Sequence, residues 1–170
     1  MTRVLIADDH GVLRDGLGRV IAAQPDLELV GSAANGEEAV ALCRETTPDV
    51  VLMDLEMPVL DGIEATRAIV ADTAGIAVLI LTSFSDRRRI VEALDAGAVG
   101  YLLKDASADD VVRGIRAAAA GGSPLDPRAA RSLLEANAEP DPLAGVSPRE
   151  REVLGLLLEG MPNKLIARRL

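Results

Sequence analysis

Short apolar runs alternate with helix-forming segments five times over residues 1–121, and this alternation limits the fold more than any other feature of the sequence. Runs that are apolar along their whole length are typical of parallel strands covered by helices on both faces. The sequence therefore predicts an α/β fold with a doubly wound, five-stranded parallel sheet. The predicted strands are 3–7, 27–33, 50–53, 77–81 and 100–103, and the predicted helices are 12–23, 36–46, 63–71, 86–96 and 108–120.

Composition excludes several other classes of protein. One cysteine, Cys43, rules out an internal disulfide framework, and one histidine, His10, rules out histidine-rich metal clusters. The apolar runs are far shorter than the roughly 20 residues that span a bilayer, and the N-terminus lacks a signal-peptide pattern. We therefore expect a cytoplasmic protein.

The charge is unevenly distributed along the chain. The formal net charge is -9, but residues 1–146 carry 13 Lys and Arg against 24 Asp and Glu, whereas residues 147–170 carry 5 against 3. An acidic first part followed by a mildly basic segment is compatible with a nucleic-acid contact near the end of the chain, or with an ordinary solvated helix face.

Polar residues follow the predicted strands where each strand ends. In an open parallel sheet, ligands bind at the carboxyl ends of the strands. The residues that the sequence brings to this edge are Asp8 and Asp9, Asp54, Thr82 with Ser83, and Lys104. Three carboxylates held together repel one another, and a hard divalent cation with oxygen ligands relieves the repulsion. The pattern favours Mg²⁺, with Asp54 as a nucleophile toward phosphorus.

Four motifs with matching spacing resemble the receiver domain of bacterial response regulators over residues 1–121. They are Ile6-Ala7-Asp8-Asp9-His10, Val51-Leu52-Met53-Asp54-Leu55-Glu56-Met57-Pro58, Leu81-Thr82 and Gly100-Tyr101-Leu102-Leu103-Lys104. The resemblance implies a flavodoxin-like receiver in which Asp54 accepts phosphate from the phosphohistidine of a sensor histidine kinase.

The same resemblance assigns roles to the other motif residues. Mg²⁺, or Mn²⁺ in its place, is held by Asp9, Asp54 and the backbone carbonyl of Glu56, with Asp8 assisting directly or through water. The phosphoryl group is contacted by Thr82 and Lys104. Tyr101 stands where such proteins carry an aromatic that swings inward when the threonine moves. Phosphorylation is expected to produce a homodimer, through the first and last receiver helices or the face near Tyr101.

The end of the chain resembles the start of a LuxR-type helix-turn-helix domain of the NarL/FixJ subfamily. Ser147-Pro148-Arg149-Glu150 forms a capping box, and Glu159-Gly160 and Asn163-Lys164 follow at the family's spacing. The resemblance divides the chain into a receiver (1–121), a linker with a short helix (122–146) and an incomplete helix-turn-helix segment (147–170). We expect a transcription regulator whose DNA-binding domain is cut short before its recognition helix, so that DNA binding belongs to a full-length form. Pro162 and Leu165 depart from the family pattern.

Other functions fit the residues less well. A phosphatase of the haloacid-dehalogenase type also uses a strand, an aspartate nucleophile and an acidic residue two positions later, but it leaves Asp8 and Asp9 without a role. No glycine-rich phosphate loop follows a strand. A degenerate receiver that only binds proteins would ordinarily have lost a site residue. We therefore expect a phosphoacceptor regulator that is not an enzyme beyond self-phosphorylation and autodephosphorylation. We expect His10 to be a loop or helix-start residue and Cys43 to lie in the core.

Overall fold

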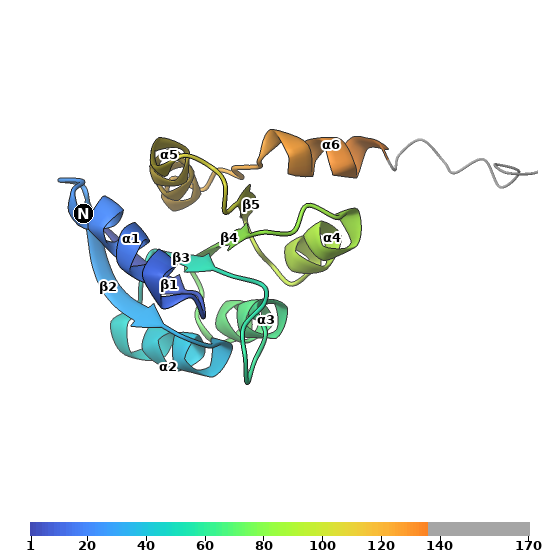
Figure 1. Ribbon diagram of the computed structural model, residues 1–170. Helices are drawn as coiled ribbons and strands as arrows, with labels where there is room; N and C mark the ends of the chain where they lie inside the picture. The colour runs from blue at the N-terminus through green and yellow to red at the C-terminus, as the bar shows by residue number, and fades with distance from the viewer. Residues whose placement is uncertain (136–170) are drawn as a thin grey trace, which may run out of the picture. The chain divides into compact units, whose positions relative to one another are not determined.

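The computed structural model describes residues 1–135. The predicted linker beyond residue 135 and the predicted helix-turn-helix segment at 147–170 lie outside these residues. Within them the predicted α/β fold is confirmed: a five-stranded parallel sheet has the strand order β2-β1-β3-β4-β5 (Figure 1). The strands are β1 (Thr2–Ala7), β2 (Leu27–Ala33), β3 (Val50–Met53), β4 (Ala77–Thr82) and β5 (Gly100–Leu103).

Helices cover both faces of the sheet. They are α1 (Gly11–Ala22), α2 (Gly36–Thr46), α3 (Gly62–Asp72), α4 (Arg87–Asp95), α5 (Ala108–Ala119) and α6 (Pro127–Glu135). Alternate side chains of the central strands point to opposite faces, so two apolar clusters form. One face packs against α1 and α5, and the other packs against α2, α3 and α4, where Cys43 is buried as expected. None of the helices that the structure describes is long and apolar enough to span a membrane.

The edge strand β2 differs from the expectation that every strand is wholly apolar. Glu28, Leu29 and Ser32 are exposed, whereas every residue of β3 is buried. The reason is position, because β2 has a hydrogen-bonded neighbour only in β1, while β3 lies between β1 and β4.

Side-chain caps fix where four helices begin. Asn35, Asp61, Asp86 and Ser107 accept hydrogen bonds from backbone N–H groups of the first turns of α2, α3, α4 and α5. Such a cap stabilises a helix by about 1 kcal/mol. Helix α1 lacks one, because its N-cap residue His10 makes no side-chain bond to the helix backbone and turns to the acidic edge of the sheet instead.

The residues that follow α5 return to the edge of the sheet. Tyr101 N–H donates to the Pro124 carbonyl at 2.9 Å, and Asp126 N–H donates to the Tyr101 carbonyl at 2.8 Å, so that Leu125 pairs with β5 in parallel. Helix α6 then packs against α4, and Ala129 is fully buried. The compact unit therefore extends to Glu135, beyond residue 121, where the sequence predicts the end of the receiver.

Candidate functional site

Asp54 follows the last residue of β3 and is only 4% exposed. Its two carboxylate oxygens have separate partners: Oδ1 accepts from Leu55 N–H at 2.7 Å, and Oδ2 accepts from Lys104 Nζ at 2.7 Å. Burial raises the pKa of Asp54, and the bond with Lys104 opposes that shift without cancelling it. The carboxylate is therefore held in place and is more basic than an exposed aspartate.

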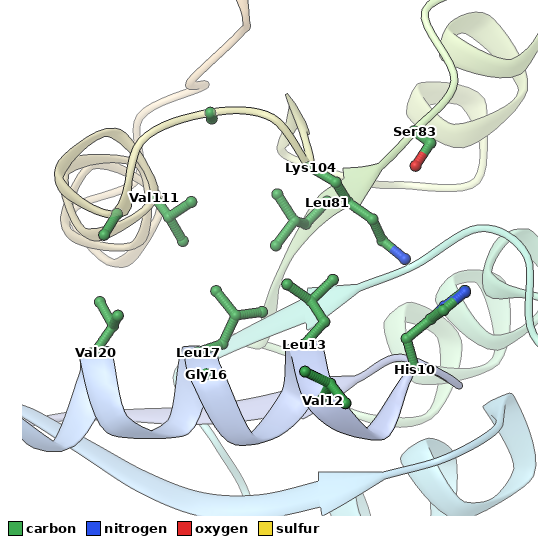
Figure 2. A pocket seen from close by; sticks show the side chains of 12 residues that line it. His10, Val12, Leu13, Gly16, Leu17, Val20, Leu81, Ser83, Lys104 and Val111 are labelled. Carbon is green, nitrogen blue, oxygen red and sulfur yellow. The ribbon is translucent and has the colours of Figure 1, made fainter.

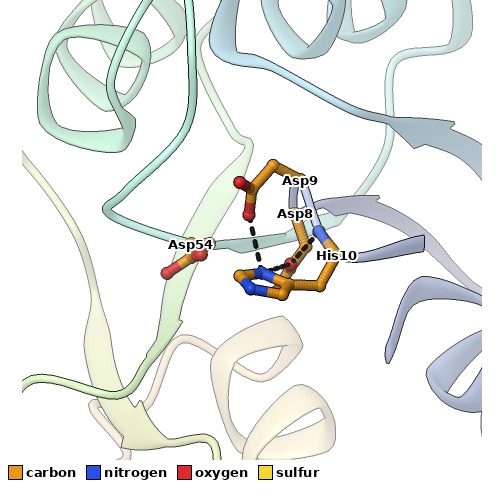
Figure 3. Close-up of side chains that lie close together, drawn as sticks. All are labelled: Asp8, Asp9, His10 and Asp54. Carbon is orange, nitrogen blue, oxygen red and sulfur yellow. Dashed lines mark hydrogen bonds and ion pairs between the residues drawn. The ribbon is translucent and has the colours of Figure 1, made fainter. Parts of the chain in front are cut away.

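The acidic pair after β1 lies beside Asp54. Asp8 is 2% exposed and Asp9 is exposed. Ligand-type atoms of Asp8, Asp9, His10 and Asp54 all lie within 4.8 Å of one another (Figure 3). A group of carboxylate oxygens at this spacing matches the donor set that hard divalent cations take.

Lys104, which follows β5, joins the two buried carboxylates. Its Nζ lies 2.7 Å from Asp8 Oδ2 and 2.7 Å from Asp54 Oδ2. Burial by itself would lower the pKa of Lys104, but the two carboxylates more than offset this, and its pKa is raised. The ammonium group therefore stays charged and balances part of the negative charge. No peptide bond between described residues is cis, so the Lys104–Asp105 bond is trans.

Thr82 ends β4 close to Asp54, and its side chain is 0% exposed. Its Oγ1 makes no hydrogen bond of normal geometry to a described residue, although the nearby hydroxyl group opposes the rise in the pKa of Asp54. Leaving such a group unpaired costs about 1–3 kcal/mol. An oxygen-rich ligand at Asp54 would recover that loss.

Tyr101 already points into the protein. Its ring is fully buried and its hydroxyl donates to the Phe84 carbonyl at 2.9 Å, in the loop that follows Thr82. Burial raises the pKa of the Tyr101 phenol far above its ordinary value. The structure thus shows the Tyr101 ring in an inward position. The inward movement that the family resemblance implies for phosphorylation stays a prediction.

Glu56 lies in the loop between β3 and α3. Its carboxylate forms an ion pair with Arg89 on α4 at 3.0 Å, and Arg89 also stacks over the Phe84 ring at 4.4 Å. Glu56 and Asp9 line the same hollow of about 490 Å³. Pairing across 33 residues leaves no local pattern, so the sequence does not predict the contact between Arg89 and Glu56.

The His10 ring lies against the acidic pair that precedes it in the sequence, and the sequence alone does not show this orientation of the ring. Its Nδ1 lies 2.7 Å from Asp9 Oδ1 and 3.2 Å from Asp8 Oδ1, although the ring is 68% exposed. The residue is the N-cap of α1, in agreement with the predicted loop or helix start.

An apolar groove of about 600 Å³ opens next to the site, between α1 and the segment from Lys104 to α5. Leu13, Leu17 and Val20 of α1 face Val111 of α5 across it, and Lys104 and His10 lie at one end (Figure 2). The groove joins the acidic site to an apolar face of the protein.

Gly62 opens α3 directly behind Asp54. A Cβ atom at this position would lie 1.9 Å from the Asp54 carbonyl oxygen, which the backbone cannot vacate. We expect Gly62→Ala to lower the free energy of unfolding by about 3 kcal/mol, the upper end for an overpacked site. Urea titration measures the effect. Gly16→Ala in α1 is the matched control, because its Cβ would meet nothing within 4 Å, and it should stabilise by about 0.5–1 kcal/mol. Equal effects of the two substitutions would contradict the packing behind Asp54.

Two family models match the sequence. Residues 4–116 match the response regulator receiver domain, and residues 144–170 match the luxR family of bacterial regulatory proteins. The chain is 40% identical over 174 residues to the transcriptional regulatory protein LiaR of Bacillus subtilis, covering 100% of this chain and 82% of LiaR. It is 38% identical over 173 residues to the nitrate/nitrite response regulator protein NarL of Escherichia coli, covering 98% of this chain and 80% of NarL.

Solved structures agree with these matches. A LuxR-family two-component response regulator from Aurantimonas sp. superposes with a TM-score of 0.77 at 38% identity, covering 82% of this chain and 100% of that one. The receiver domain of a NarL-type regulator from Mycobacterium tuberculosis superposes with a TM-score of 0.69 at 32% identity, covering 71% of this chain and 97% of that one.

Proposed function

The chain belongs to the response regulators of two-component systems that carry a LuxR-type DNA-binding domain, and on this basis we propose that Asp54 is its phosphoacceptor. The observation that carries the proposal is the convergence of Asp8, Asp54 and Lys104, whose charged groups meet through two contacts of 2.7 Å at the ends of β1, β3 and β5. LiaR is named a transcriptional regulatory protein and NarL a response regulator protein. We propose no enzymatic turnover beyond self-phosphorylation and autodephosphorylation.

The donor set fits a divalent cation. The carboxylates of Asp8, Asp9 and Asp54 with the backbone carbonyl of Glu56 would hold Mg²⁺, or Mn²⁺ in its place. The bound ion would neutralise part of the charge that gathers on the carboxylates and the phosphoryl oxygens. The hydroxyl group of Thr82 supports the assignment of Asp54 as phosphoacceptor, because a phosphoryl oxygen on Asp54 would supply the acceptor that this hydroxyl group lacks.

The chain's own groups can carry the transfer. A carboxylate oxygen of Asp54 forms a bond to phosphorus while the bond from phosphorus to the donor's imidazole nitrogen breaks, and that nitrogen keeps the electron pair. The Leu55 N–H fixes the orientation of the carboxylate. Lys104 Nζ, which lies against Asp54, and Thr82 Oγ1 then donate to the transferred phosphoryl oxygens. Because the Tyr101 hydroxyl donates to the Phe84 carbonyl, a movement of the loop after Thr82 would change the position of Tyr101.

The partners follow from the family and from the exposed faces. We propose a sensor histidine kinase as the phosphate donor in the cytoplasm, and control of transcription through DNA binding by a domain to which the LuxR-type segment belongs. The phosphorylated chain is proposed to form a homodimer through α1 and α5, because the Tyr101 face is covered by residues 124–135. The apolar groove and the 90% exposed Val12 favour the same face.

Removing the metal tests the proposal. We expect incubation with acetyl phosphate and Mg²⁺ to add one phosphoryl group to the chain, measured by intact-mass spectrometry. A chelator should reduce the addition by at least about a hundredfold, since carboxylates that repel one another also repel the phosphate. Equal addition with and without the chelator would contradict the metal site. Steady release of phosphate without a mass adduct would favour the phosphatase alternative.

A further inference from the structure

Helix α6 is held against the receiver by apolar and backbone contacts. Ala129 is fully buried in the apolar cluster on the face of the sheet that packs against α2, α3 and α4, and Leu133 packs against the same cluster. The segment before the helix pairs with Tyr101 of β5 through two backbone hydrogen bonds. These contacts place α6 next to β5, the edge strand that contains Tyr101 and directly precedes Lys104 (Figure 1).

One contact of α6 reaches the loop that follows Thr82. Ser132 Oγ donates to the Ser85 carbonyl at 3.0 Å. The preceding carbonyl, that of Phe84, accepts the Tyr101 hydroxyl. The loop between β4 and α4 is therefore bound at two successive carbonyls, three residues or fewer from the threonine.

A second contact of α6 reaches the residue after Lys104. Arg128 donates from its guanidinium to both carboxylate oxygens of Asp105, one of them at 2.7 Å, and its Nε lies 3.2 Å from Asp126 Oδ1. An exposed ion pair of this kind adds little to stability. Its two-point geometry nevertheless fixes where Asp105 and the adjoining Lys104 stand.

The two loops are also joined to each other, because Lys104 N–H donates to the Thr82 carbonyl at 2.8 Å. In this arrangement the Lys104 ammonium already lies on Asp54, and the buried Thr82 hydroxyl makes no hydrogen bond of normal geometry to a described residue. In the conformation with α6 docked, the Lys104 ammonium and the Thr82 hydroxyl therefore lie where they could donate to a phosphoryl group on Asp54.

We propose that α6, when docked, positions the loops that carry Lys104 and Thr82 and so favours phosphorylation of Asp54. This proposal rests on the proposed function. Arg128 and Ser132 are the positioning residues, acting through Asp105 and Ser85 on the loops of Lys104 and Thr82. Coupling between two sites is reciprocal. Phosphorylation therefore strengthens the docking of α6, which is the last described element before the residues that match the luxR family.

The test measures both directions of the coupling on the full chain. Arg128→Ala combined with Ser132→Ala should slow phosphoryl uptake from acetyl phosphate by about fivefold or more, which corresponds to about 1 kcal/mol of activation free energy. Arg131→Ala is the matched control, because Arg131 is an exposed arginine of the same helix with no hydrogen bond or ion pair to any described residue. It should leave the rate unchanged. Ser132→Thr, which keeps the hydroxyl group, should restore the uptake lost in Ser132→Ala.

Hydrogen exchange supplies the reverse measurement and does not depend on a variant that folds. The amides of α6 in the wild-type chain should exchange about fivefold more slowly, or slower still, after phosphorylation. Unchanged exchange on phosphorylation, or normal uptake by a double variant whose α6 amides have lost protection, would overturn the coupling while leaving Asp54 as phosphoacceptor. Absence of uptake by the wild-type chain would overturn the proposed function and the coupling together.

Discussion

Replacing Asp54 by asparagine is expected to abolish phosphoryl uptake while the chain stays folded. The amide has nearly the same size and keeps an oxygen that can accept from Leu55 N–H, but it cannot form an acyl phosphate. Uptake from acetyl phosphate should fall below detection, which in an intact-mass experiment corresponds to a loss of at least about a hundredfold. No other described change should have a larger effect on the reaction.

Stability separates this loss from misfolding. Burial raises the pKa of Asp54 above its ordinary value, so the ionised group is less favourable in the folded chain than in the unfolded one. Above the ordinary pKa of an aspartate the charge therefore destabilises the fold, and Asp54→Asn should unfold at the same or a higher urea concentration than the wild type. Asp95→Ala, which removes an exposed carboxylate at the end of α4, is the control and should take up phosphate normally. Uptake by Asp54→Asn equal to that of this control would contradict the assignment.

Replacing Lys104 by methionine is expected to destabilise the chain and to slow phosphorylation. The change leaves the carboxylates of Asp8 and Asp54 buried without the ammonium group that lies 2.7 Å from each. Breaking a buried pair on one side costs about 3–5 kcal/mol, and because Lys104 is 14% exposed we expect about 3 kcal/mol near pH 8. Urea titration measures this difference.

The pH dependence of that deficit has a definite sign. Removing Lys104 takes away the group that lowers the pKa of Asp54, so that pKa rises further in the folded variant. A carboxyl group with a raised folded pKa loses stability as the pH rises from about 4, the ordinary aspartate value, to its folded pKa. The deficit should therefore be small near pH 4 and full near pH 8. Arg113→Met, which breaks an exposed pair with Asp110, should cost about 0.5 kcal/mol or less at either pH. A deficit for Lys104→Met that does not change with pH would contradict the buried pair.

The sequence predicts most of the fold because the signals are local. The predicted strands 27–33, 50–53 and 100–103 and the predicted helix 36–46 have the same bounds in the structure, and the other strands and helices of residues 1–121 differ by one residue at one end or both. The main difference is β2, whose exposed residues reflect its place at the edge of the sheet. Strand order is a property of the folded chain, and no local pattern specifies which strand lies at the edge.

The candidate site is predicted as a set of residue types, and its contacts are not. Topology alone brings the ends of β1, β3 and β5 to one edge, so the proximity of Asp8, Asp54 and Lys104 could be expected. The unpaired hydroxyl of Thr82 depends on how the surrounding side chains pack. The contact of Ser132 with Ser85 spans 47 residues and leaves no periodic signal. The Gly121-Gly122-Ser123-Pro124 stretch is typical of the end of a helix or domain. No local pattern predicts that the chain then returns to pair with β5.

The most direct test of the account is the chemical identity of the phosphorylated residue. Borohydride reduces an aspartyl phosphate to homoserine, and tryptic cleavage after Arg44 and Arg67 isolates residues 45–67, which contain Asp54. Sequencing of this peptide by mass spectrometry, after treatment of the chain with acetyl phosphate and Mg²⁺, should give homoserine at position 54 and unchanged aspartate at positions 49 and 61. Homoserine at any other position, or a phosphorylated chain with intact aspartate at 54, would contradict the central claim.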